Sequence, residues 1–454
     1  MAETLDMTSG KPAPLMLRLS IPIVLGGSID AVYSIANGAI LGQFVNINAF
    51  TAFGVSTYVY WMVLCIIQGM ASGFTFVFAK RFGEGDRRGL SAAAAMSFLI
   101  TAVFSCLLTI SGVICVSRLL TLLNTPAEIV GYARVYLQIR LAFIPAAFFC
   151  ATVNALFYAA GNSRTPFAAN AFSIVINVAL SAFFVLATPL GIAGVALASG
   201  AGQLFASVYC AARLSKSGII KIEKNLFKPD FSVIRPLLSV GLPLGFRDLP
   251  SAAVTLLIQQ AVNGFGLPFV AGVAAGKQFN YLLFLMGESF SKAVMVYVGQ
   301  NVGANNYARV SAGVKTAVKI TLIVVLAMIA AVAPFRRLII PLFITGGSAA
   351  SVSALRFGLR QFEIILLMTP AYYLTLLFRG IFNGLGNGFW PMISGILEAA
   401  ARVAVVFLLI PVIGEWGVYI AEPIGWPLMA GLLIIVYLAS SRSAKSKGLG
   451  RMFT

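Results

Sequence analysis

The chain has 454 residues, of which 59% are hydrophobic and only 10% are charged. Soluble globular proteins carry about 45–50% apolar and about 25% charged residues, so this composition excludes an ordinary soluble protein and predicts a polytopic membrane protein. The formal net charge of +18 raises the alternative of a nucleic-acid partner. The lysines and arginines fall mainly in short gaps between apolar runs, however, which is typical of cytoplasmic loops at an anionic membrane surface. We therefore expect a lipid bilayer, and no nucleic acid, as the surroundings of this chain.

Apolar runs long enough to cross a bilayer follow one another along the chain. A helix needs about 20 apolar residues to cross a hydrocarbon layer of about 30 Å, and this measure predicts twelve membrane spans. In the first half they lie at residues 15–41, 51–79, 90–116, 133–159, 165–188 and 191–213. In the second half they lie at residues 236–262, 267–299, 311–335, 356–382, 389–411 and 416–439. The first run extends far beyond a signal-peptide core, so we expect a retained helix and an all-α integral membrane protein.

A basic segment near the middle of the chain separates the two sets of spans. From Arg213 to Arg235 it holds six lysines and arginines against two acids, Glu223 and Asp230. The excess of basic residues in alternate loops places this segment and both termini in the cytoplasm of a bacterial-type inner membrane. The predicted domains are an N-terminal six-helix bundle, a basic linker, a C-terminal six-helix bundle and a basic tail, at residues 1–213, 214–235, 236–440 and 441–454.

Short motifs recur at matching positions of the two halves. Residues 161–166 (GNSRTP) match residues 386–391 (GNGFWP), and residues 191–195 (GIAGV) match residues 414–418 (GEWGV). Because each half holds six spans, an even number, the second copy enters the membrane the same way up as the first. Parallel repeats of this kind predict a central cleft between the halves and alternating access by rocking of one half against the other.

Several motifs, taken in order, resemble one transporter family over essentially the whole chain. They are residues 20–22 (SIP), 41–44 (LGQF), 161–166 (GNSRTP), 241–243 (GLP), 298–304 (VGQNVGA) and 398–402 (EAAAR). The chain resembles the multidrug and toxic compound extrusion (MATE) transporters, and more closely their DinF-like bacterial branch. The resemblance implies a V-shaped pair of six-helix bundles, and we expect a monomer. It also implies export of small organic, cationic or amphipathic drug-like compounds by antiport against sodium ions or protons, with no other cofactor.

The chain departs from this family at three acidic positions. Many members carry an aspartate where this chain has Asn37, and another where it has Ser181. A glutamate that other branches use in the seventh span has no counterpart among residues 249–252 (LPSA). The usual ion-responsive groups of the first bundle therefore cannot be transferred unchanged.

Asp30 is the acidic residue that the predicted spans place inside the first bundle. An ionisable group at bilayer depth costs at least ~2.5 kcal/mol, so it is a functional candidate by default. Asp30 lies seven residues, about two helical turns, before Asn37, so both project from nearly the same face. We expect Asp30 to respond to the coupling ion, with Asn37, Asn177, Ser181 and Asn154 as polar partners. The alternative is structural: hydroxyl groups hold Asp30, and the amides bond between helices.

Two acid–base pairs lie four residues apart in spans of the second half. Glu288 precedes Lys292, and Glu398 precedes Arg402, an order and spacing that favour an ion pair along one helix. For Glu288 and Lys292, structural pairing and a titrating role in the cleft both remain open. We expect Glu398 and Arg402 to hold the second bundle together, with ion coupling as the alternative.

Further charged candidates for a substrate or cation site in the second half are Arg247, Asp248, Lys277 and Glu363. Adjacent residues on a helix diverge by about 100°, so Arg247 and Asp248 are not expected to pair with each other. Pro250 follows them closely, and a helix break there would free backbone carbonyl groups for a ligand.

Aromatic side chains could line a cleft that accepts flat or cationic compounds. The candidates are Tyr33, Tyr58, Trp61, Phe279, Tyr281 and Tyr372. The alternative is that these rings pack within the bundles or face lipid.

Two other classes of protein fit the sequence less well than an exporter. A flippase for a lipid-linked saccharide or another anionic amphiphile would use a basic cleft, for which Arg247, Lys277, Lys292 and Arg402 are suited, but it would have additional spans. An enzyme is not expected, because the chain has no histidine and contains neither HExxH nor GxSxG. The five cysteines lack metal-ligand spacing, so no metal site is expected. The sequence also lacks the GxxxxGK[ST] motif of ATP-binding loops, so we do not expect ATP to be the energy source.

Overall fold

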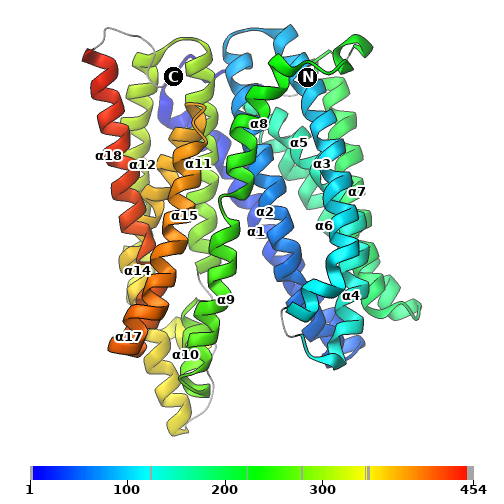
Figure 1. The fold of residues 1–454 in the computed structure, drawn as a ribbon, viewed down its shortest axis with the longest axis vertical. Helices are drawn as coiled ribbons and strands as arrows, with labels where there is room; N and C mark the ends of the chain where they lie inside the picture. Colours follow the sequence, from blue (N-terminus) through cyan, green and yellow to red (C-terminus); the bar gives the residue numbers. More distant parts are fainter. Residues whose placement is uncertain are drawn as a thin grey trace. The chain divides into compact units, whose positions relative to one another are not determined.

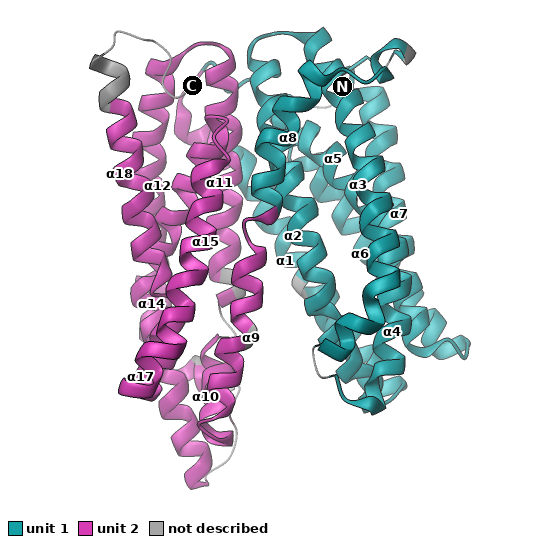
Figure 2. Cartoon of the chain, viewed as in Figure 1, with its two compact units in different colours: residues 1–9, 18–245 teal, residues 10–17, 246–454 magenta. Residues whose placement is uncertain are grey.

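A computed structural model describes residues 4–122, 125–221, 223–277, 280–342, 344 and 348–446. Within these ranges the chain is almost entirely helical and contains no β-strand, as the predicted all-α fold class requires (Figure 1). Helix contacts divide the chain into two compact units (Figure 2). Unit 1 comprises Met1–Ser9 and Arg18–Gly245, and unit 2 comprises Gly10–Leu17 and Phe246–Thr454.

The helices that carry unit 1 coincide with the spans predicted for the first half. They are α1 (Pro12–Phe44), α2 (Ile47–Gly83), α3 (Arg87–Leu122), α4 (Ala127–Ala142), α5 (Ile144–Ala159), α6 (Arg164–Ala187) and α7 (Gly191–Ser217). A short 3₁₀ helix, η1 (Lys224–Phe227), and α8 (Phe231–Phe246) follow. The fourth predicted span is bent by 47° between α4 and α5. Pro145 lies at the start of α5 and lacks the N–H that would continue the helix, which accounts for the bend.

Unit 2 contains the spans predicted for the second half, except for the first part of the seventh span, which α8 supplies in unit 1. Its longer helices are α9 (Leu249–Asn263), α10 (Leu267–Lys277), α11 (Asn280–Gly303), α12 (Tyr307–Val332), α14 (Ala349–Gly384), α15 (Phe389–Ala404) and α18 (Gly425–Ser446). Shorter pieces complete it: η2 (Ala333–Phe335), α13 (Arg336–Ile339), η3 (Ile340–Leu342), the π-helical η4 (Val405–Leu409), α16 (Ile410–Ile413) and α17 (Glu415–Ala421). Helices α10 and α11 both pack against α14.

Nine helices in the described part of the chain are long and apolar enough to cross a membrane, or ten if the bent pair α4 and α5 counts as one span. The two remaining predicted spans are each made of two consecutive helices. Residues 236–262 are divided between α8 and α9, and residues 267–299 between α10 and α11. All twelve predicted spans therefore coincide with helices or with consecutive helix pairs.

The division between the units lies at Gly245, inside the seventh predicted span, whereas the sequence places the linker at residues 214–235. Close packing of α8 on α2 explains the difference. A Cβ atom on Gly69 of α2 would lie 2.2 Å from the carbonyl oxygen of Leu244, so only glycine allows this approach. Helix α8 consequently belongs to unit 1, and the chain enters unit 2 at the break between α8 and α9.

Candidate ion-coupling and substrate sites

Two hydrogen-bonded contacts join α1 and α6 in unit 1. The Asn170 amide donates to the Asp30 carboxylate over 3.0 Å, and the Asn37 amide donates to Asn177 Oδ1 over 2.9 Å. The two residues on each helix are seven positions apart, so the contacts lie about two turns from each other. Asp30 and Asn37 therefore both face α6. We call these two contacts the α1–α6 ladder.

The buried end of the ladder continues to α7. The Asn177 amide nitrogen donates to Ser199 Oγ over 3.0 Å, and the Tyr33 hydroxyl lies 2.9 Å from the same oxygen. Ser199 in turn donates to the Val195 carbonyl. Asn37, Asn177 and Ser199 are buried, whereas Asp30 is exposed. The ladder thus connects an exposed carboxylate on α1 with a buried neutral network.

Two buried oxygens beside this network have no hydrogen-bond partner among the described residues. They are Oδ1 of Asn37 and Oγ of Ser181, and both side chains are fully buried. Leaving a buried polar group without a hydrogen-bond partner costs about 1–3 kcal/mol, so a ligand that bonds to such an atom would remove this cost. Oxygens of this type are the ligands that hard cations prefer.

Asn154, the remaining polar candidate of the first bundle, lies among sulfur atoms. The Cys210 thiol donates to its Oδ1 over 3.3 Å, and its amide nitrogen lies 3.7 Å from Cys150 Sγ. Its hydrogen bonds therefore go to α5 and α7 rather than to the α1–α6 ladder.

A cation that the sequence analysis did not single out lies in unit 1. The guanidinium carbon of Arg140 on α4 lies 4.0 Å from the centre of the Tyr60 ring, a cation–π contact. Arg140 also interacts electrostatically with Tyr33, which belongs to the buried network of α1. The signal was present in the sequence, because Arg140 falls within a predicted span, where an ionisable residue is a functional candidate.

The second unit contains a buried ion triad. Glu398 on α15 accepts hydrogen bonds from Arg379 on α14 over 2.8 Å and from Arg402 over 2.5 Å. Arg379 also donates to Ser394 Oγ over 2.9 Å. The side chains of these three charged residues are 7–10% exposed. The structure thus brings together the expected Glu398–Arg402 pair, and it adds Arg379, which sequence spacing did not reveal because it comes from another helix.

Further charges extend this triad at both ends. Glu422 pairs with Lys277 over 2.7 Å and interacts electrostatically with Arg402. Asp248 interacts electrostatically with Arg379 and Arg402 and pairs with its neighbour Arg247. The resulting charge chain runs through Lys277, Glu422, Arg402, Glu398, Arg379, Asp248 and Arg247. It has alternating signs and one more basic than acidic residue.

The pairing of Arg247 with Asp248 corrects an expectation from the sequence. Two hydrogen bonds, of 2.8 and 2.7 Å, join the guanidinium to the carboxylate. The expectation assumed a continuous helix, in which adjacent side chains diverge. In the structure α8 ends at Phe246 and α9 begins at Leu249, so the two residues occupy the helix break that Pro250 favours.

Glu288 and Lys292 are not brought together: within the described residues no ion pair joins them, although both lie on α11. Glu288 is exposed and interacts electrostatically with Tyr372, and Lys292 is half-buried. The spacing permits a pair but does not require one. Glu363 lies apart from the charge chain, in an exposed pair with Arg336 over 2.7 Å.

The aromatic candidates differ in their surroundings. Tyr372 packs in unit 2 with its ring centre 4.3 Å from that of Phe284 and 4.9 Å from that of Trp426. Tyr58 and Trp61 on α2 are 65% and 48% exposed. Phe279 and the side chain of Tyr281 lie outside the described residues.

Two helical units, each burying polar or charged groups among apolar helices, define a polytopic membrane protein equipped to handle ions or small solutes. The MatE family model matches residues 22–183 and 243–408, which is well over half of the chain, so the protein belongs to the MatE family of transporters. The resemblance noted from the sequence motifs is thereby confirmed.

Curated relatives and solved structures agree with this assignment. The chain is 26% identical to the probable multidrug resistance protein YpnP of Bacillus subtilis, over 67% of this chain and 68% of that protein. It is 22% identical to the probable multidrug resistance protein NorM of Thermotoga maritima, over 90% and 89% of the two chains. A crystal structure of MATE in the bent conformation has a TM-score of 0.88 at 20% identity and covers 98% of this chain and 99% of that one.

A second solved structure has the same TM-score of 0.88 at 20% identity, over 95% of this chain and 97% of that one. It is a MOP superfamily transporter from Pyrococcus furiosus, described as having a binding pocket of reverse polarity that suggests a different function. At this level of identity the likeness concerns the fold, and it confirms the predicted fold class.

Proposed function

We propose that this protein is a secondary active transporter that exports small organic compounds by antiport against sodium ions or protons, with alternating access between its two bundles. Family membership and the names of the multidrug resistance relatives support export of drug-like compounds. The observation that supports ion coupling is the α1–α6 ladder, which joins an exposed carboxylate to a buried polar network.

Asp30 is the proposed ion-responsive group. It is exposed, so a proton or a cation can reach it. A change in its charge would alter its hydrogen bond with Asn170 and thereby the contact between α1 and α6. Asn37 and Asn177 stand two turns further along the same helices, where the unpartnered Asn37 Oδ1 offers a neutral ligand. Ion binding that favours one arrangement of α1 and α6 would shift the equilibrium between transporter conformations, since a ligand shifts an equilibrium only by its differential affinity.

Cationic or amphipathic substrates are proposed first, because aromatic side chains such as Tyr58 and Trp61 are exposed in unit 1 and suit flat cationic rings. The alternative is a flippase for a lipid-linked saccharide or another anionic amphiphile. It is favoured by the excess of basic over acidic residues in the charge chain of unit 2. Both substrates would cross a bacterial-type inner membrane in which we propose a monomer with cytoplasmic termini.

Transport into proteoliposomes tests this function. The full chain is reconstituted, a sodium or a proton gradient is imposed, and uptake of a cationic dye, a zwitterionic compound and an anionic amphiphile is followed. Gradient-driven movement of the cationic dye supports the exporter. Movement of the anionic amphiphile alone supports the flippase, and movement of none of the three under either gradient contradicts antiport.

The role of Asp30 is tested with Asp30→Asn, which keeps the side-chain shape and its contact with Asn170 but removes the charge. We expect gradient-driven transport to fall at least tenfold, while the melting temperature in detergent stays near that of the wild type. Glu84→Gln, in the exposed loop after α2, is the matched control and should transport normally. If Asp30→Asn transports as well as the control, coupling must lie in unit 2, with Asp248, Glu288 or Glu363 next in line.

A further inference from the structure

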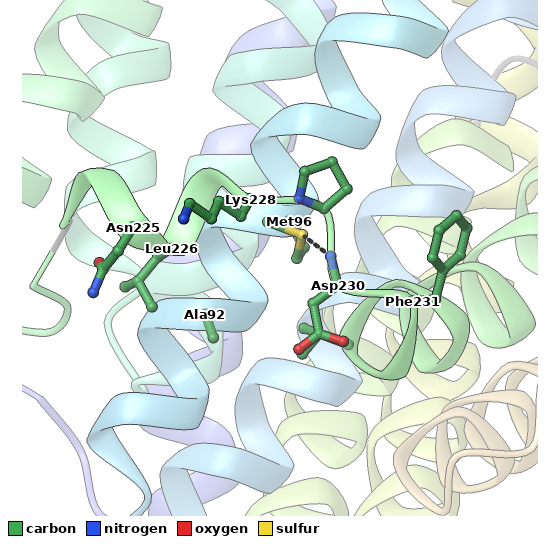
Figure 3. Close-up of a pocket in the computed structure, with 9 residues that line it drawn as sticks. Ala92, Met96, Asn225, Leu226, Lys228, Asp230 and Phe231 are labelled. Carbon is green, nitrogen blue, oxygen red and sulfur yellow. Dashed lines mark hydrogen bonds between the residues drawn. The ribbon is translucent and has the colours of Figure 1, made fainter.

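The described residues of the segment that connects α7 to α8 contact α3 at two points. The backbone N–H of Lys221 donates to Ser91 Oγ over 3.1 Å. The backbone N–H of Asp230 points to Met96 Sδ over 3.5 Å, and Figure 3 shows this contact. Both partners lie in the first three turns of α3, which begins at Arg87. The connection is therefore held at the end of the bundle where the chain leaves the apolar region.

A pocket of about 400 Å³ opens between this connection and α3 (Figure 3). Its lining divides into an apolar part and a polar part. The apolar part includes Ala92, Met96 and Leu226, and the polar part consists of Asn225, Lys228 and Asp230. All of these residues belong to unit 1.

The pocket presents charges of both signs. Lys228 and Asp230 both line the pocket and are exposed, and Figure 3 shows their charged ends pointing in different directions. Asp230 Oδ1 accepts hydrogen bonds from the backbone N–H of Ser232 over 2.9 Å and from its hydroxyl over 2.6 Å. These bonds lower the pKa of Asp230, so the carboxylate is charged at neutral pH. A ligand that contacts both residues would carry an anionic group for Lys228 and a cationic group for Asp230.

The next residue along the chain indicates a membrane-bound ligand. Phe231 lines the pocket, is 79% exposed, and directly follows Asp230. An exposed aromatic ring beside charged groups is typical of segments that lie in the headgroup region of a bilayer, where the ring contacts acyl chains.

We propose that this pocket binds the headgroup of a phosphatidylethanolamine molecule from the cytoplasmic leaflet. Lys228 contacts the phosphate, Asp230 accepts hydrogen bonds from the primary ammonium, and the apolar lining with Phe231 contacts the glycerol and the upper acyl chain. A purely anionic headgroup would place its charge near the Asp230 carboxylate. A trimethylammonium headgroup has no N–H to donate to that carboxylate.

Native mass spectrometry of the detergent-solubilised full chain tests the proposal. The protein is titrated with phosphatidylethanolamine, phosphatidylcholine and phosphatidylglycerol that carry the same acyl chains. We expect phosphatidylethanolamine to bind the most tightly, and Lys228→Gln and Asp230→Asn each to weaken its binding about tenfold or more, as the loss of a charge-assisted hydrogen bond predicts. Asparagine also begins helices well, so Asp230→Asn should leave α8 folded, which a melting curve checks.

Two matched controls carry the same charge changes at exposed positions outside the pocket lining, Arg88→Gln and Glu223→Gln. Both should bind phosphatidylethanolamine like the wild type. The proposal is overturned if all three lipids bind equally, or if the controls weaken binding as much as the pocket variants. It is also overturned if phosphatidylglycerol binds best and Asp230→Asn tightens it, which would indicate a simple anion site.

Discussion

Gly73 of α2 lies directly against Gly241 of α8, and a Cβ atom on Gly73 would lie 2.4 Å from the Gly241 Cα. No other residue type fits this position without moving one of the helices. The contact holds α8 in unit 1, next to the break at which the chain passes into unit 2.

Gly73→Ala should therefore lower the melting temperature, although replacing a helical glycine by alanine ordinarily stabilises a protein by roughly 0.5–1 kcal/mol. Gly54→Ala on the same helix is the control, since a Cβ atom there meets no other atom within 4 Å. We expect this control to melt at or above the wild-type temperature. Equal melting temperatures for the two variants would show that α2 and α8 do not pack as described.

Glu398→Gln should be strongly destabilising, because it leaves Arg379 and Arg402 buried without their shared carboxylate. Breaking a buried ion pair in this way typically costs about 3–5 kcal/mol. Glu363→Gln removes a carboxylate from an exposed pair and should cost only about 0–1 kcal/mol. Unfolding of both variants in mixed micelles measures the difference, and similar losses would contradict the burial of the triad.

Double-mutant cycles should separate two candidate ion pairs of unit 2. Lys277 and Glu422 are in contact, so Lys277→Met alone should destabilise more than the double change with Glu422→Gln, with a coupling energy of about 0.5–3 kcal/mol. Lys292→Met and Glu288→Gln should instead add independently, because no ion pair joins these residues in the described part of the chain. A coupling energy for the second pair as large as that for the first would restore the structural pairing that the spacing permits.

The bonds from Ser232 to Asp230 predict a pH dependence. They lower the pKa of Asp230 in the folded state below its unfolded value, so their contribution to stability is present above the unfolded pKa, about 3.9, and is lost as the pH falls through the folded pKa. Ser232→Ala should thus have a lower melting temperature than the wild type at pH 7, and this difference in melting temperature should shrink below about pH 4. Ser239→Ala, at an exposed position on α8, should show no such pH dependence. A difference in melting temperature that does not change with pH would mean that the Ser232 hydroxyl does not stabilise the protein by its bond to the Asp230 carboxylate.

Hydropathy along the chain was sufficient to predict the helices, because a bilayer requires long apolar helices and each one can be recognised in its own segment. The same holds for Glu398 and Arg402, which are neighbours on one helix. Arg379 could not be found in this way, since its contact with Glu398 depends on how α14 packs against α15.

Local breaks were harder to predict than helices. The pairing of Arg247 with Asp248 depends on the end of α8 at Phe246, and regular helix geometry gave the wrong expectation there. The position of α8 depends on the glycines of α2, whose effect cannot be seen in α8 itself. The α1–α6 ladder lies between these cases: the sequence put Asp30 and Asn37 on one face, but only packing supplied Asn170 as the partner of Asp30.

The excess of one basic residue in the charge chain of unit 2 would make transport sensitive to voltage if these residues move through the membrane field during the cycle. An elementary charge moved through the whole membrane field changes the free energy by about 2.3 kcal/mol per 100 mV. A conformational change that carries the chain across part of this field therefore moves charge by itself, before any substrate or ion is counted. The turnover rate would then depend on the membrane potential even when the exchanged solutes carry no net charge.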